Sequence, residues 1–171
     1  MDFLEIEKNS KYINEVEKLY LDAFPEIERL SFEELINNEN GKIIGFIIEN
    51  ELIGFSYVRV LGQFAYIVYL AIDKDKRNKG LGSQALKIID KIYFNKTKVL
   101  CVEKPKLINN IRTRRIGFYR RNGFVLTNFQ FEYYGEIFYS MYKGEFDKQK
   151  FIKFLLTCFP DCKNFIDFDV K

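Results

Sequence analysis

The chain has 171 residues, of which 47% are hydrophobic and 30% are charged, and its formal net charge at pH 7 is only +3. A chain of this length forms one ordinary domain and buries roughly 70% of the surface that its unfolded form exposes. The near balance of charge excludes a strongly basic nucleic-acid binder. Histidine is absent, which excludes Ser-His-Asp and Cys-His triads and every metal site with a histidine ligand.

The first half of the chain predicts a strand, two helices and three further strands. Apolar residues recur at helical spacing over 11–23. Ser31 followed by Glu34 is typical of a capping box, which indicates a second, short helix. The predicted strands cover 3–7, 43–49, 52–60 and 66–72. The first alternates apolar and acidic residues like a half-buried edge strand, the next two form a hairpin, and the last is apolar enough to be buried on both faces.

The second half predicts helices that alternate with strands, followed by a hairpin and a last helix. The predicted helices run from Leu81 to Ile92, over 109–122 and over about 147–157, and the predicted strands cover 99–102, 124–131 and 136–142. Gly123 is expected to end the second of these helices as a C-cap. Consecutive strands followed by a β-α-β crossover imply a mixed α/β sheet. We expect one domain over 1–145 and a C-terminal helical extension, 146–171, packed on it.

A glycine-containing loop follows the 66–72 strand and opens the next helix. Residues 77–82 read Arg-Asn-Lys-Gly-Leu-Gly. The glycines let a phosphate approach the backbone closely, and the N–H groups and dipole of the helix start favour negative charge. The basic side chains add to this attraction. The loop therefore predicts a cradle for a pyrophosphate.

Two other phosphate-binding motifs fit this loop less well. The P-loop pattern G-x-x-x-x-G-K-[ST] is absent from the chain. The dinucleotide pattern G-x-G-x-x-[GA] is met by Gly80, Gly82 and Ala85, with Glu103 about twenty residues further on. In that fold the first glycine follows its strand directly, whereas here the seven polar residues 73–79 intervene.

A second motif, Phe-Tyr-Arg-Arg-Asn-Gly-Phe at 118–124, follows one helix and one strand after the loop. The strand 69–73, the R-x-x-G-x-G loop and F-Y-x-x-x-G-F, in this order, resemble the GNAT acetyltransferase family from about residue 43 to 142. Residues 22–29 resemble the acceptor-side region of some members. The resemblance implies an α/β fold with a mixed, mostly antiparallel central sheet flanked by helices.

The resemblance also implies acetyl-CoA as the acyl-donor co-substrate, with no metal. The implied cofactor-binding residues are Leu70, Ala71, Ile72, Arg77, Asn78, Lys79, Gly80, Leu81, Gly82, Ser83, Asn110 and Arg112. Backbone N–H groups at Leu70 or Ile72 would form an oxyanion hole for the thioester carbonyl. Many members carry an asparagine seven residues before the tyrosine, where this chain has Arg112. The contact at that position is therefore left open between Arg112 and the nearby Asn109 and Asn110.

Tyr119 is the implied general acid for the departing thiolate, because a phenol is protonated at neutral pH. An amine would attack directly in a ternary complex, which needs no histidine. Without histidine, carboxylates are the main candidates for removing the amine proton, with Glu103 as a possible general base ahead of Glu26 and Glu28. A water chain or a tyrosine is the alternative. The substrate-side candidates are Glu26, Glu28, Arg29, Tyr133 and Tyr134.

The expected activity is N-acetyl transfer to a small amine, a peptide N-terminus or a lysine. One alternative is a non-catalytic acyl-CoA-binding module on the same fold. Another is a protein-interaction domain, suggested by the aromatic C-terminal tail. We expect a cytoplasmic monomer or homodimer with no nucleic-acid or membrane partner, because the N-terminus lacks a signal peptide and the longest apolar run is short.

Overall fold

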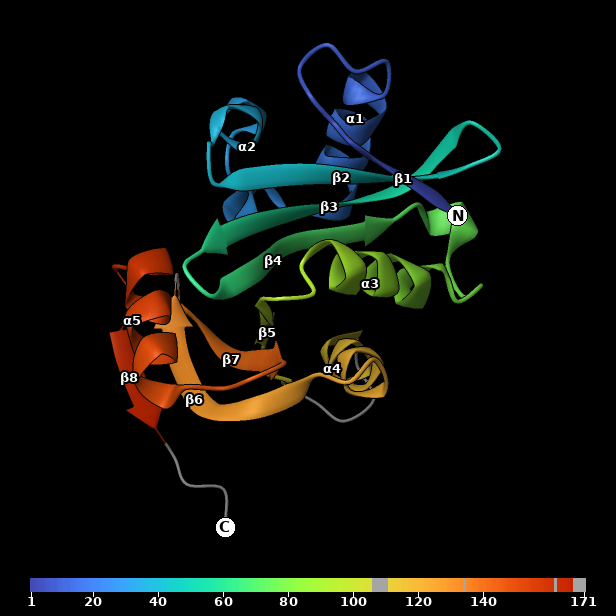
Figure 1. The fold of residues 1–171 in the computed structure, drawn as a ribbon. Helices are drawn as coiled ribbons and strands as arrows, with labels where there is room; N and C mark the ends of the chain where they lie inside the picture. Colours follow the sequence, from blue (N-terminus) through green and yellow to red (C-terminus); the bar gives the residue numbers. More distant parts are fainter. Residues whose placement is uncertain (106–110, 134, 162, 168–171) are drawn as a thin grey trace. The chain divides into compact units, whose positions relative to one another are not determined.

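The computed structural model describes residues 1–105, 111–133 and 135–161, and the backbone of 163–167. It contains two compact units, Met1–Phe94 and Asn95–Lys171. The first unit runs from blue to green in Figure 1 and the second from yellow to red. Among the described helices, none is long and apolar enough to cross a membrane.

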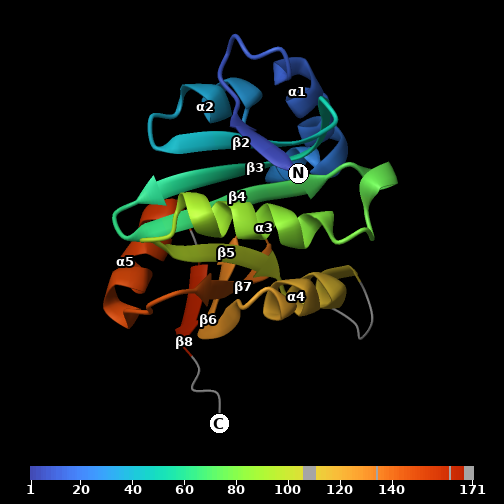
Figure 2. The same ribbon diagram turned by 45° about the vertical axis from the view of Figure 1, so that its right-hand side comes forward.

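The first unit is an antiparallel sheet in the order β1-β2-β3-β4 with helices on both faces. Its strands are β1 Asp2–Glu5, β2 Gly41–Ile48, β3 Glu51–Leu61 and β4 Phe64–Ile72. Its helices are α1 Ile13–Ala23, α2 Phe32–Asn37 and α3 Leu81–Ile92, with short 3₁₀ turns η1 Glu26–Glu28 and η2 Lys74–Lys76. Helices α1 and α2 cover one face of this sheet, and α3 lies on the other (Figures 1 and 2).

Aromatic side chains dominate the core under α1 and α2. Val16 and Tyr20 of α1 follow its N-cap residue, Tyr12, at intervals of four, so the three side chains share the face that meets the sheet. Phe55 and Tyr57 lie two residues apart on β3, and Tyr69 and Ala71 lie two residues apart on β4, so each pair faces the same side of the sheet. Leu35 of α2 belongs to the same cluster. Ser31 and Glu34 form the predicted capping box at the start of α2. This core fixes β4 beneath the segment that joins α1 to α2.

The expected half-burial of the N-terminal strand is wrong. All four residues of β1 are exposed, with Phe3 at 51% and Leu4 at 45% exposure, and Ile6 just after the strand enters the core. The buried residues lie instead in its partner strand β2, because α2 packs on β2. Burial of the β4 strand on both faces holds only for its first half, since Val68, Leu70 and Ile72 are half-buried.

The second unit is an antiparallel sheet in the order β5-β7-β6-β8 with two helices. Its elements are β5 Thr97–Glu103, α4 Ile111–Arg121, β6 Val125–Tyr133, β7 Glu136–Lys143, α5 Lys148–Cys158 and β8 Lys163–Asp167. Gly123 ends α4 as expected, with φ of 87°. The N–H of Phe124 donates to the Tyr119 carbonyl and that of Gly123 to the Arg120 carbonyl, which is a Schellman motif.

The C-terminal segment packs within the second unit. Phe151 of α5 is fully buried, and its ring centroid lies 5.9 Å from that of Phe129 on β6. Phe146 stacks on Tyr142 of β7 at 4.3 Å. The last helix lies where the aromatic pattern predicts it, whereas strand β8, paired with β6, was not predicted. The division into a 1–145 domain and a 146–171 extension stays a prediction.

Candidate functional site

The glycine loop presents backbone N–H groups at the start of α3. Asn78 and Gly80 both have positive φ, at 64° and 74°, and Gly80 is the N-cap of the helix. The N–H groups of Ser83 and Gln84 donate to the Gly80 carbonyl at 3.1 and 3.2 Å. The N–H groups of Leu81 and Gly82 precede this first turn, so they lack an intrahelical acceptor. Because Gly80 supplies no capping side chain, these two groups can receive an anion.

Two basic residues, Arg77 and Lys79, directly precede this helix start. Arg77 is exposed, and its Nε donates to the carbonyl of Ile72 at 2.9 Å, which ties the loop back to the end of β4. Lys79 and Asn78 are exposed beside Gly80. These positions agree with an anion-binding loop, and contact of each residue with a cofactor stays a prediction.

Two further backbone N–H groups lie along the edge of β4 that faces away from β3. The N–H of Asp73 donates to the Ile53 carbonyl of β3 at 3.0 Å, and the ladder continues in register from Ile72 opposite Gly54. Because donors alternate along an antiparallel ladder, the N–H groups of Leu70 and Ile72 point away from β3. A Cβ on Gly54 would lie 2.6 Å from the Ala71 carbonyl oxygen, so this close pairing needs glycine. Pairing of this edge of β4 with an extended ligand stays a prediction.

The acceptor-side candidates lie on and beside η1. Glu26 and Glu28 are exposed, and Arg29 directly follows them with a half-buried side chain. The hydroxyl of Tyr69 donates to the Glu28 carbonyl at 2.7 Å, and that of Tyr20 donates to the Leu30 carbonyl at 2.9 Å. The sequence pattern pointed to these two tyrosines only as core residues, because nothing local to them marks a partner so far along the chain.

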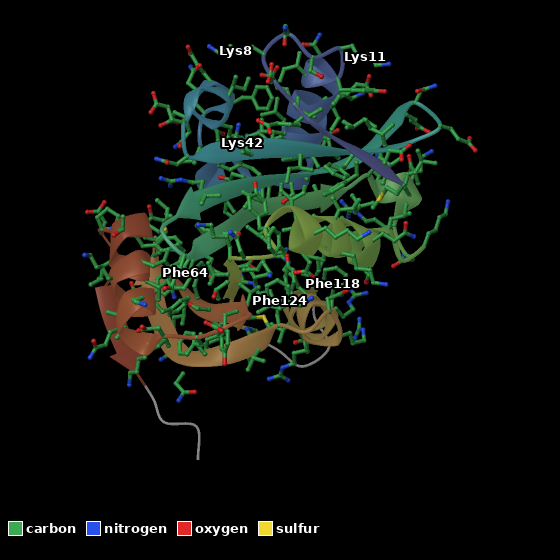
Figure 3. All side chains as sticks on the ribbon, in the orientation of Figure 1. Lys8, Lys11, Lys42, Phe64, Phe118 and Phe124 are labelled. Atoms are coloured by element: carbon green, nitrogen blue, oxygen red, sulfur yellow. The ribbon has the colours of Figure 1, made fainter. Side chains whose placement is uncertain are left out.

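Tyr119 lies on α4 in the second unit and is 9% exposed. Its ring contacts Phe118 and Phe124, both labelled in Figure 3, with centroids 5.1 and 5.6 Å away. Burial raises the pKa of Tyr119 to about 12, although the nearby Arg115 charge acts in the opposite direction. The phenol is therefore protonated throughout the neutral range and can donate a proton.

Glu103, the candidate base, ends β5 and is 9% exposed. Its Oε2 accepts a hydrogen bond from Arg115 on α4. Its Oε1 lies 4.0 Å from Nε of Arg112, which is beyond hydrogen-bond distance. A role of Glu103 as the general base stays a prediction. The pairing with Arg115 was not predicted, because the arginine-rich helix predicts a solvated face as readily as an ion pair.

Arg112 and the remaining candidates have other partners. Arg112 donates to the Lys104 carbonyl at 3.2 Å and to Oε2 of Glu136 at 2.9 Å. Tyr133 of β6 packs edge-on against Phe159, with ring centroids 5.2 Å apart. Asn110 and Tyr134 lie outside the described residues. Cofactor binding by Arg112 and substrate binding by Tyr133 stay predictions.

Comparison with known families decides the affiliation of the chain. The acetyltransferase (GNAT) family model matches residues 11–124. The chain belongs to the GNAT family. The match spans residues 22–29, the glycine loop and the F-Y-x-x-x-G-F motif, so the resemblance seen in the sequence is confirmed. No curated protein matches the sequence. Among the described residues of this GNAT chain, no cluster of three or more cysteine or acidic side chains could hold a metal ion.

Solved structures confirm the fold class, α/β with a mostly antiparallel sheet flanked by helices. A Bacteroides thetaiotaomicron protein described as a GNAT acetyltransferase has a TM-score of 0.78 at 23% identity, over 93% of this chain and 96% of its own. The aminoglycoside 6′-N-acetyltransferase from Enterococcus faecium has a TM-score of 0.68 at 17% identity, over 86% and 100%. A GNAT acetyltransferase from Elizabethkingia anophelis, solved with acetyl-CoA bound, has a TM-score of 0.62 at 17% identity, over 84% and 97%.

Proposed function

We propose that this GNAT chain transfers the acetyl group of acetyl-CoA to a primary amine by direct attack in a ternary complex. The observation that carries the proposal is the start of α3, where the N–H groups of Leu81 and Gly82 have no helical acceptor and the N-cap, Gly80, supplies no capping side chain. Such a helix start, flanked by Arg77 and Lys79, suits a pyrophosphate. The donor set of the loop therefore fits the cofactor that the resemblance implies.

The edge of β4 suits the other half of the cofactor. N–H groups of Leu70 and Ile72 that point away from β3 would pair with the amides of the pantetheine arm, as an added strand does. One of them would also donate to the thioester carbonyl and stabilise the oxyanion that forms on attack. Ala71, between them, is buried in the core under α1 and α2 and would hold the strand in place.

The reaction then needs two proton transfers. The amine nitrogen forms a bond to the acetyl carbon, and the carbon–sulfur bond breaks. Tyr119 donates its hydroxyl proton to the departing thiolate. The attacking nitrogen gives up a proton, which Glu103 accepts at Oε1, directly or through water. No covalent enzyme intermediate forms, so the mechanism does not require a histidine to activate a nucleophile.

A cationic small amine is the favoured acceptor class. Glu26 and Glu28 are exposed on η1, and Asp22 is exposed on the last turn of α1. An ammonium substrate would be attracted to this acidic segment. The aminoglycoside acetyltransferase among the structural neighbours acts on an amine of this kind, which supports the same class here. A peptide N-terminus and a lysine side chain are the other two classes to test.

The test has two arms. Isothermal titration with acetyl-CoA should give saturable binding. The absence of any heat of binding at millimolar acetyl-CoA would contradict the proposal. Thiol release should then be measured with kanamycin, spermidine, an alanyl peptide and Nα-acetyl-lysine, and we expect a cationic amine to give the highest kcat/KM. Binding of acetyl-CoA without thiol release on any of these amines would instead favour a non-catalytic acyl-CoA-binding module.

Replacing Glu103 with glutamine should lower kcat/KM at pH 7 about 100-fold, because the amide cannot accept the amine proton. The fall of kcat/KM toward acid pH should also become shallower. Both quantities come from initial rates of thiol release between pH 5.5 and 9. Glu136→Gln is the matched control, since it removes a carboxylate that lies 2.9 Å from Nη1 of Arg112. Equal losses in the two variants would mean that the ion pairs matter and that Glu103 is no base.

A further inference from the structure

The hydroxyl of Tyr69 makes two hydrogen bonds to the segment that joins α1 to α2. It donates to the carbonyl of Glu28 at 2.7 Å and accepts the N–H of Leu30 at 3.1 Å. Tyr69 belongs to β4 and is 6% exposed. A single phenol therefore satisfies a backbone acceptor in the last residue of η1 and a backbone donor two residues further on.

Tyr20 of α1 holds the same segment from a second element. Its hydroxyl donates to the Leu30 carbonyl at 2.9 Å, and its side chain is fully buried. Burial, together with the neighbouring Tyr69 hydroxyl, raises its pKa well above the usual range, so this donor keeps its proton at any ordinary pH. The rings of Tyr20 and Tyr69 meet edge-on at 5.0 Å, and Phe24 lies 4.7 Å from Tyr69. Packing thus fixes the direction of both hydroxyls.

The strand that carries Tyr69 also carries the edge assigned above to the acyl donor. Leu70 and Ile72 direct their N–H groups to that edge, while Tyr69 directs its side chain to the face under α1. Neighbouring residues of one rigid strand therefore reach both the pantetheine edge and the acceptor segment. Sites on regular elements hold their geometry better than sites on free loops.

We propose that Tyr69 and Tyr20 are positioning residues that hold residues 26–30 as a preformed wall of the acceptor subsite. This inference rests on the proposed acetyl transfer. The hydrogen bonds hold the backbone of Glu28 and Leu30 inward, so the side chains of Glu26 and Ile27, both exposed, project from the turn. Loss of the bonds loosens the wall and weakens acceptor binding, without touching the cofactor loop.

The test replaces Tyr69 with phenylalanine and measures exchange and kinetics on the full chain. The Leu30 amide loses its acceptor, so its hydrogen exchange, followed by NMR, should quicken about tenfold. The KM for the most active amine of the panel above should rise about five- to tenfold, as expected for one or two lost hydrogen bonds. The kcat and the KM for acetyl-CoA should stay within about twofold.

Tyr12→Phe is the matched control. Tyr12 lies on the same face of α1, is 5% exposed, and its hydroxyl donates to the Asn50 carbonyl at 3.1 Å. This variant loses a bond of the same kind at the β2–β3 turn, so it should leave Leu30 exchange and the acceptor KM unchanged. If Tyr12→Phe raises the acceptor KM as much as Tyr69→Phe, general loosening explains the effect and the inference is overturned.

The two proposals fail in different ways. If wild-type protein acetylates none of the panel amines, the proposed function fails, and the acceptor role of the wall fails with it. If wild type is active and Tyr69→Phe keeps its acceptor KM, only the positioning inference is overturned. Should Tyr69→Phe not fold, Tyr20→Phe removes the bond to Leu30 alone and is expected to raise the acceptor KM about threefold.

Discussion

Replacing Tyr119 with phenylalanine should lower kcat about 100-fold, because the departing thiolate then leaves without a proton donor. The Kd for acetyl-CoA, measured by titration, should change by less than about twofold. The substitution removes one oxygen from a ring that already packs against Phe118 and Phe124, so the fold should tolerate it. Single-turnover thiol release is the direct measurement, since it isolates the chemical step from product release.

The pH profile sharpens this prediction. Burial raises the pKa of Tyr119 to about 12, so the acid stays protonated as pH rises through the neutral and mildly alkaline range. Loss of Tyr119 as a donor should therefore lower kcat only as pH approaches that value. Tyr142→Phe is the control within the second unit, where that ring stacks on Phe146. A Tyr119→Phe enzyme with wild-type kcat would remove this residue from the mechanism.

Replacing Gly80 with alanine should weaken acetyl-CoA binding about ten- to hundredfold, the equivalent of one lost charge-assisted hydrogen bond. Gly80 has φ of 74°, a conformation that disfavours a Cβ by roughly 1–2 kcal/mol. A Cβ built there meets no atom of the described residues within 4 Å. It would therefore project into the open space over the helix start, where we place the pyrophosphate. Titration with acetyl-CoA measures the loss.

Gly62→Ala separates backbone strain from the loss of anion binding. Gly62 lies in the β3–β4 turn of the same unit with φ of 58°, and a Cβ there also meets none of the described atoms within 4 Å. Both variants should lose similar stability in urea unfolding, whereas only Gly80→Ala should lose affinity. Equal acetyl-CoA affinity in the two variants would contradict an anion site at this helix start.

Local signals in the chain predicted most of the elements and the position of the glycine loop at the start of α3. The capping box at Ser31 and the glycine cap at Gly123 concern groups a few residues apart, so a short stretch of sequence contains them completely. The glycine loop is similar, because a helix start after a strand is itself a local event. The half-burial expected for residues 3–7 was wrong, since alternation shows two different faces but not whether another element covers one of them.

By itself, the sequence determined the order of the elements as far as α5, the family and the position of the glycine loop at a helix start, because each depends on residues that are neighbours in the chain. Only the tertiary structure showed that Glu103 is paired with Arg115, and that Tyr69 bonds to Glu28, 41 positions earlier. Those partners depend on which strand lies under which helix. The sequence does not show whether a hydroxyl or a carboxylate faces water, a backbone carbonyl or a guanidinium. Only a buried group needs a partner within the protein, and the tertiary structure decides which groups are buried.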